Sequence, residues 1–225
     1  MLPGLSPAII FSNALGKEFN SLILFHRNAA RMEKLEAENS VLRARLNSAN
    51  EISFENKRLR DLLDFKNKNE WNTVAAAVIG RQPENWSSMV LINKGASSGI
   101  RNGSVVVNRT GLVGRIAETS ASAAKVMLIN DPNFSVSAFV QRSRQEGLVT
   151  GTLGSNLVMK YLPPDADIQE KDIIVSSGLT GMSPKGLLIG TVVKTGMEFS
   201  GLGKYAVISP AADLPAIEEV LVVKQ

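Results

Sequence analysis

The side chains that could do chemistry are few in this sequence. The 225-residue chain has no Cys, which excludes thiol nucleophiles, disulfides and Cys-ligated zinc or iron–sulfur sites. Its single histidine, His26, excludes multi-histidine metal sites and leaves one candidate for a histidine base. A lone histidine in a predicted helix is usually a surface or seam residue, so we do not expect His26 to be catalytic.

Two small groups of polar residues remain as candidates. Asp165 and Asp167 are spaced to present two carboxylates on one face of an extended segment, but nothing nearby in sequence completes a metal shell. Ser177 or Ser183 could act with Lys185 as nucleophile and base, a pairing that the sequence leaves open without a supporting motif. The residues therefore indicate no enzyme, no metal site and no cofactor.

Two segments are spelled like nucleotide-binding motifs. The segment 176–186 superficially suggests a phosphate loop, but Lys185 follows Pro184 and precedes Gly186, which predicts a wide hairpin loop instead. The segment 201–206 has the spacing of a dinucleotide fingerprint, yet it leads into a predicted strand. No helix N-terminus would then face a pyrophosphate, so we expect no such site.

Composition adds limits on partners. The chain is 44% apolar and 20% charged, with a net charge of +4 divided evenly between residues 1–72 and 73–225, so no concentrated nucleic-acid patch is expected. We also expect no small-molecule substrate. No apolar run is long enough to span a bilayer, and no signal peptide is evident. Such a chain is either soluble as it stands or the extracytoplasmic part of an anchored protein.

The elements that would position any site fall into two chemically different parts. Neither glycine nor proline occurs between Lys17 and Ile79, whereas 16 of the 18 glycines lie in residues 73–225. Because these residues are the main helix breakers, the sequence predicts one long helix in residues 1–72, beginning near Ser6-Pro7. A helix of about 60 residues would be about 90 Å long and would need a partner helix.

Apolar spacing identifies the face that would meet this partner. Residues separated by alternating steps of three and four form the seam of a heptad coiled coil, with one stammer at Ile52. Asn39 and Asn56 fall in this seam, where a buried Asn pair favours two strands in register. We therefore predict a parallel homodimer through Met32, Leu35, Asn39, Leu42, Leu46, Ala49, Ile52, Asn56, Leu59 and Leu63. The alternative is a single amphipathic helix lying on its own domain.

From Thr73 onward, short Val/Ile/Leu runs are broken by Gly, Pro, Asn and Asp, which predicts β-strands and turns. The candidate strands are 73–79, 89–93, 104–107, 111–116, 124–129, 136–140, 145–150, 157–161, 173–175, 187–193, 205–209 and 219–223. With almost no helical periodicity here, small barrels or a sandwich are expected. The fold class is thus mainly β, with a long N-terminal helix.

The β region also repeats itself. Residues 100–107 parallel 168–175, and Lys125–Ile129 parallel Lys204–Ile208. Two similar six-stranded barrel subdomains are therefore predicted, at approximately 73–150 and 151–225, with interleaving allowed. We expect turn or close-approach roles for Gly95, Gly99, Gly103, Gly111, Gly114, Gly178, Gly186 and Gly190.

The ordered combination of segments resembles one known family over essentially the whole chain. The residues that carry the resemblance are Glu38–Leu42 and Glu55–Leu63 in the helix, Val90–Gly95, Thr110–Ile116 and Val126–Asp131 in the first repeat, and Ser177–Gly190 in the second. The layout is similar to that of the rod-shape-determining family MreC. It departs from that family in lacking an N-terminal transmembrane helix.

This resemblance implies a non-enzymatic scaffold on the periplasmic face of the inner membrane, anchored by the missing helix. It implies self-association into dimers and higher assemblies, and binding to a class B penicillin-binding transpeptidase, which we expect chiefly on the first barrel. MreD and, indirectly, the actin-like MreB are implied as further partners in cell-wall elongation. The alternative is a periplasmic membrane-fusion adaptor of a transport complex, which would need two antiparallel helices inserted within the β region.

Overall fold

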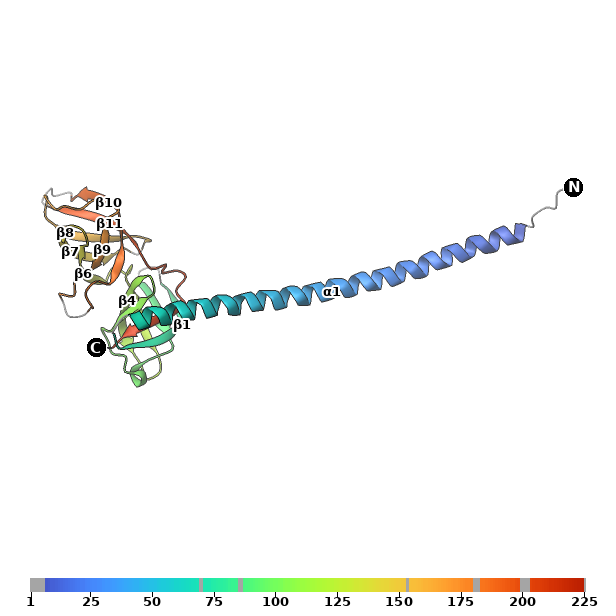
Figure 1. Ribbon diagram of the computed structural model, residues 1–225, viewed down its shortest axis with the longest axis horizontal. Helices are drawn as coiled ribbons and strands as arrows, with labels where there is room; N and C mark the ends of the chain where they lie inside the picture. The colour runs from blue at the N-terminus through green and yellow to red at the C-terminus, as the bar shows by residue number, and fades with distance from the viewer. Residues whose placement is uncertain are drawn as a thin grey trace. The chain divides into compact units, whose positions relative to one another are not determined.

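A computed structural model describes residues 7–68, 71–84, 87–152, 154–179, 183–198 and 203–224; the side chains of residues 7–30, 68, 82–84 and 87 lie outside this description. The chain begins with one long helix, α1 (Pro7–Lys68), and the strands follow it (Figure 1). Pro7 suits the first helical position because its missing N–H has no partner there. The predicted cap, Ser6, lies outside the described residues.

The chain divides into two compact units, Met1–Lys57 and Arg58–Gln225. The last turns of α1 therefore belong with the strands, although the sequence placed the boundary at residue 72. The physical reason is that side chains near the helix end pack on the first barrel, as described below.

Each predicted strand is present, with ends shifted by a few residues. The strands are β1 (Thr73–Glu84), β2 (Ser87–Ile92), β3 (Val105–Asn108), β4 (Gly111–Thr119), β5 (Ala124–Leu128), β6 (Ser135–Val140), β7 (Glu146–Gly151), β8 (Leu157–Leu162), β9 (Ile173–Ser176), β10 (Leu188–Met197), β11 (Lys204–Pro210) and β12 (Glu219–Val223). A single 3-10 turn, η1 (Ala96–Ser98), lies between β2 and β3. Alternation of buried and partly exposed residues in β5 illustrates the pattern that identified them.

The strands close into two antiparallel barrels. The first has the order β1-β12-β3-β4-β5-β2 and the second has the order β10-β11-β8-β7-β6-β9. In the first barrel, β12 returns from the end of the chain to pair with β1, with Thr73 opposite Val223. The second barrel is thus inserted between β5 and β12, and it includes β6 and β7, which lie before the approximate boundary at residue 150.

The two barrels share one cyclic strand order. If β1 to β5 are matched with β7 to β11, the remaining strands β12 and β6 occupy the same place in each barrel. The sixth strand is therefore last in the chain for the first barrel and first in the chain for the second. The repeat in sequence could not show this, because it covers only the segments around β3 to β5 and β9 to β11.

The turns before β3 and β9 share the same hydrogen bonds and backbone conformation, which supports matching the two barrels in this way. The Gly103 N–H donates to the Ile116 carbonyl at 2.8 Å, and the Lys171 N–H donates to the Val192 carbonyl at 2.8 Å. Both residues have left-handed backbones, with φ of 84° and 72°. Ser104 Oγ accepts from the Arg101 N–H in the first turn, and Asp172 Oδ2 accepts from the Gln169 N–H in the second.

Candidate interaction site

The predicted seam residues all lie on α1, and each is exposed in the single chain. Leu42 is 56% exposed and Leu46 is 60% exposed, which is unusual for leucines in a stable helix. Val41 and Phe54 are also exposed, but they lie off the seam. An apolar stripe of this length has no covering surface within the described part of its own chain, which favours a partner.

One face of the helix end is buried instead. Leu62 is only 6% exposed and belongs to the core cluster, and Phe65 packs against that cluster from the same face. Phe65 also meets Trp71 edge to face, with ring centroids 6.4 Å apart. These apolar contacts hold the end of α1 on the first barrel.

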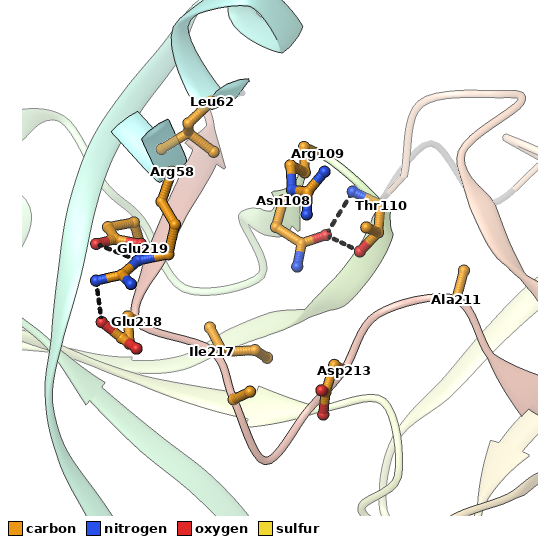
Figure 2. A pocket seen from close by; sticks show the side chains of 11 residues that line it. Arg58, Leu62, Asn108, Arg109, Thr110, Ala211, Asp213, Ile217, Glu218 and Glu219 are labelled. Carbon is orange, nitrogen blue, oxygen red and sulfur yellow. Dashed lines mark hydrogen bonds and ion pairs between the residues drawn. The ribbon is translucent and has the colours of Figure 1, made fainter. Parts of the chain in front are cut away.

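Ion pairs surround this buried face. Arg58 contacts Glu218, at the end of the segment that returns to β12, and lies 3.3 Å from Glu219, the first residue of β12 (Figure 2). Asp61 lies 3.6 Å from Arg109, in the β3–β4 turn. A pocket of about 250 Å³ lies among these side chains.

The sequence did not identify this second face. The predicted seam uses Leu59 and Leu63 and leaves out Leu62, which lies between them. This extra leucine was the one sign in the sequence of a second apolar face. The ionic partners were out of reach, because Arg58 and Glu218 are 160 residues apart in the chain.

The eight singled-out glycines divide by physical role. Gly99, Gly103, Gly178 and Gly186 have positive φ, Gly95, Gly114 and Gly190 have no room for a Cβ, and Gly111 combines both features. Gly114 and Gly190 are equivalent in the repeat. An added Cβ would overlap the carbonyl oxygen of Met127 at Gly114 and that of Ser209 at Gly190, so both strands need glycine for close approach.

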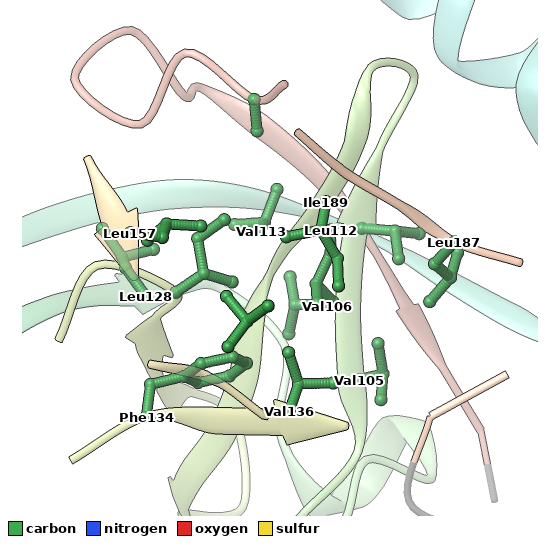
Figure 3. Packing of buried hydrophobic residues seen from close by; sticks show 14 of the residues in the cluster. Val105, Val106, Leu112, Val113, Leu128, Phe134, Val136, Leu157, Leu187 and Ile189 are labelled. Atoms are coloured by element: carbon green, nitrogen blue, oxygen red, sulfur yellow. The ribbon is translucent and has the colours of Figure 1, made fainter. Parts of the chain in front are cut away.

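Gly111 lies where the two barrels touch. A Cβ there would overlap the carbonyl oxygen of Leu188, at the start of β10 in the second barrel. Around this contact, buried side chains of both barrels form one apolar cluster, including Leu112 and Val113 with Leu187 and Ile189 (Figure 3). The barrels are therefore packed together rather than simply tethered.

A charged cluster stabilises the second barrel. Arg142 donates to Asp172 at 2.8 and 2.9 Å and to Asp167 at 2.6 and 2.9 Å. Asp172 is 8% exposed. Hydrogen bonding to Arg142 lowers the pKa of both carboxyl groups below the ordinary value. Asp167 thus serves an ion pair within the fold, and the predicted pairing with Asp165 is not what positions it.

The segment spelled like a phosphate loop lies between β9 and β10. Ser176 donates to the Pro184 carbonyl at 2.6 Å and accepts from the Leu187 N–H at 2.9 Å, so its side chain joins the two ends of this loop; residues 180–182 lie outside the described part. The dinucleotide spelling continues into β11, although residues 201 and 202 lie outside the described part. The side chain of His26 also lies outside it. Among the described residues, no group of His, Asp and Glu is arranged to hold a metal ion.

Within the described ranges, no helix is both long enough and apolar enough to span a bilayer.

Comparison with known proteins agrees with this architecture. The Cell shape-determining protein MreC of Listeria monocytogenes is 34% identical over 181 residues, covering 78% of this chain and 61% of the relative. A solved structure of MreC matches with a TM-score of 0.72 and 28% identity, covering 76% of this chain and 98% of that one. The chain thus spans about three fifths of the length of this curated relative.

A third similarity concerns the fold alone. MreC from Helicobacter pylori, solved in a complex with penicillin-binding protein PBP2, matches with a TM-score of 0.54 and 18% identity, over 68% of this chain and all of that one. Residues 78–224 match the family described as rod shape-determining protein MreC, barrel core. This range includes nearly all of both barrels. The chain therefore belongs to the MreC family of cell shape-determining proteins.

Proposed function

We propose that this chain is a non-enzymatic scaffold that self-associates through α1 and presents its barrels to a peptidoglycan synthase. The observation that carries the proposal is the contrast within one chain between an uncovered heptad seam and two closed barrels. A rod that pairs and a rigid head suit a protein that holds other proteins in place.

The proposed synthase is a class B penicillin-binding transpeptidase. Support comes from the Helicobacter pylori complex, in which a protein of this fold is bound to PBP2. We place the contact chiefly on the first barrel. Anchoring at the periplasmic face of the inner membrane, with MreD and indirectly MreB as further partners, completes the proposal and rests on the family resemblance.

The membrane-fusion adaptor is the weaker candidate. It requires two antiparallel helices inserted in the β region, whereas the described residues contain one long helix that precedes β1. Between β1 and β12, the only helical element in the described part of the chain is the short 3-10 turn η1.

Photo-crosslinking in cells tests the proposed partner. A crosslinking amino acid would replace Leu91 or Glu118 on the first barrel, Tyr161 or Met197 on the second, or Val41 on the helix; all five positions are exposed. We expect adducts with a class B penicillin-binding protein from barrel positions, strongest on the first barrel. Adducts confined to Val41 would contradict the docking proposal.

A further inference from the structure

The outer face of the second barrel carries both tyrosines of the chain on neighbouring strands. Tyr161 lies on β8 and Tyr205 on β11, and β11 lies between β8 and β10 (Figure 1). Tyr205 lies opposite two residues, Lys160 and Tyr161, because β8 has one extra residue in its pairing with β11. The next residue, Ala206, is fully buried, so alternation along β11 turns Tyr205 outward.

The backbone of Tyr161 is strained while its ring remains in solvent. Its φ is 60°, in the left-handed region that bulky residues rarely adopt, and its side chain is 76% exposed. Bulges and strained backbones are concentrated at functional sites, where they aim a side chain at a ligand. The conformation of Tyr161 therefore favours a binding role over a packing role.

The ring of Tyr205 lies flat on the sheet. Gly196 of β10 is its partner in the pairing of β10 with β11. A Cβ added to Gly196 would lie 2.6 Å from Cζ and 2.7 Å from Oη of Tyr205, so the far end of the ring covers this glycine. One face of such a ring meets the backbone and the other faces away from the sheet. Exposed ring faces on a sheet form a platform on which the ring of a ligand can stack.

Two lysines flank the tyrosines. Lys160 precedes Tyr161 on β8, and Lys194 lies on β10 opposite Val207 of β11. Both lysines are exposed, and no ion pair joins either of them to another residue that the structure describes. Their Cα atoms are two strands and two residues apart, which is roughly 12 Å. That separation is close to the length of one disaccharide.

We propose that this platform, formed by Tyr161, Tyr205, Lys160 and Lys194, binds a linear polysaccharide that carries a carboxylate on alternate sugars. Sugar rings would stack their C–H faces on the tyrosines, and carboxylates would accept hydrogen bonds from the lysines. This activity goes beyond the proposed scaffold function and requires neither self-association nor contact with a synthase.

The composition of the face selects this ligand. Thr191 and Ser209 form an exposed cross-strand pair on the same strands, and their hydroxyls suit a hydroxyl-rich partner better than the apolar part of a bilayer. A nucleic acid carries a phosphate on every nucleotide and favours a denser set of cations. Two lysines about one disaccharide apart match one carboxylate on every second sugar.

Isothermal titration calorimetry of the purified full chain tests the proposal. The ligand is a preparation of peptide-free glycan strands of peptidoglycan, which carry one carboxylate per disaccharide, and the neutral hexamer of N-acetylglucosamine is the matched control. We expect the glycan strands to bind more tightly than the hexamer by about tenfold. The double variant Lys160→Gln with Lys194→Gln should abolish this difference.

Two variants of Tyr161 test the platform itself. Tyr161→Ala should weaken binding by about tenfold, whereas Tyr161→Phe, which keeps the ring, should bind as the wild type does. Because the side chain is exposed, both variants should keep the circular dichroism spectrum of the wild type.

Three results would overturn the proposal: unchanged binding by Tyr161→Ala, equal affinity for the neutral hexamer and the glycan strands, or no binding of either. Tighter binding of a single-stranded oligothymidine would assign the face to nucleic acid and would also overturn it.

Discussion

The helix and the barrels use the same apolar residue types in opposite ways. Leucines along the predicted seam of α1 are about half exposed or more, whereas Leu112, Leu157 and Leu221 in the barrels are at most 1% exposed. A barrel buries apolar side chains in its own interior, whereas a single helix satisfies its backbone hydrogen bonds but has no interior in which to bury an apolar stripe. The apolar side chains of the barrels are therefore buried within one chain, whereas those of the predicted seam are exposed in it.

This contrast predicts that mutations should sort by region: barrel changes should unfold the protein, and seam changes should dissociate it. The largest effect should come from Gly190→Ala. Its Cβ would overlap the Ser209 carbonyl oxygen and the side chain of Ile208, so we expect a loss of about 3 kcal/mol or more in the free energy of unfolding.

Gly154→Ala is the matched control for this substitution. A Cβ at Gly154 meets its nearest atom at 3.5 Å, which is ordinary contact. Urea unfolding followed by circular dichroism should show a clear loss for Gly190→Ala and almost none for Gly154→Ala. Equal midpoints would show that the close approach of β10 and β11 is not required.

Leu62→Ala sharpens the comparison, because this helical residue should behave as a barrel residue. Its side chain is buried in the core cluster, so truncation should cost about 2–5 kcal/mol. Leu63→Ala, one residue away and 55% exposed, should leave the unfolding of the barrels nearly unchanged. Urea unfolding followed by circular dichroism distinguishes the two variants, and similar losses for both would show that Leu62 and Leu63 do not lie on faces of different burial.

A smaller, pH-dependent effect should distinguish the second barrel. Because Arg142 lowers the pKa of Asp172 in the folded protein, the pair stabilises the fold above the ordinary carboxyl pKa of about 3.9 and loses this effect as the pH falls below it. Arg142→Met should therefore lower Tm at pH 7, and its difference from the wild type should shrink as the pH falls below about 4.

Thermal unfolding from pH 7 to pH 3 measures this difference, with Arg101→Met as a control that leaves the Arg142 cluster intact. A difference between wild type and Arg142→Met that persists unchanged at pH 3 would mean that the ion pairs do not supply the stability.

Local features of the fold were predictable from the sequence, and distant pairings were not. The long helix and the twelve strands were predicted from the positions of Gly and Pro and from apolar residues that recur every two to four positions. Any short stretch of sequence contains this information. The return of β12 to β1 depends on a pairing of Thr73 with Val223, and the Arg142–Asp172 cluster joins residues 30 apart. No composition or spacing rule indicates such contacts.

The same reasoning explains what the sequence said about the interaction site. The predicted seam rests on periodicity alone, so it could be proposed without coordinates. The docked face, with Leu62 and Arg58, is defined by the barrel surface that it touches, and that surface exists only after strands from both ends of the β region have closed.

The central claim is that the exposed seam of α1 is completed by a second copy of the chain. Sedimentation of the double variant Leu42→Asp with Leu46→Asp tests it most directly, because two charges in each helix of a paired seam would cost several kcal/mol. Val41→Asp, equally exposed but off the seam, is the control. The account predicts a dimer for the wild type and for Val41→Asp, and a monomer with folded barrels for the double variant; a double variant that remains dimeric would contradict it.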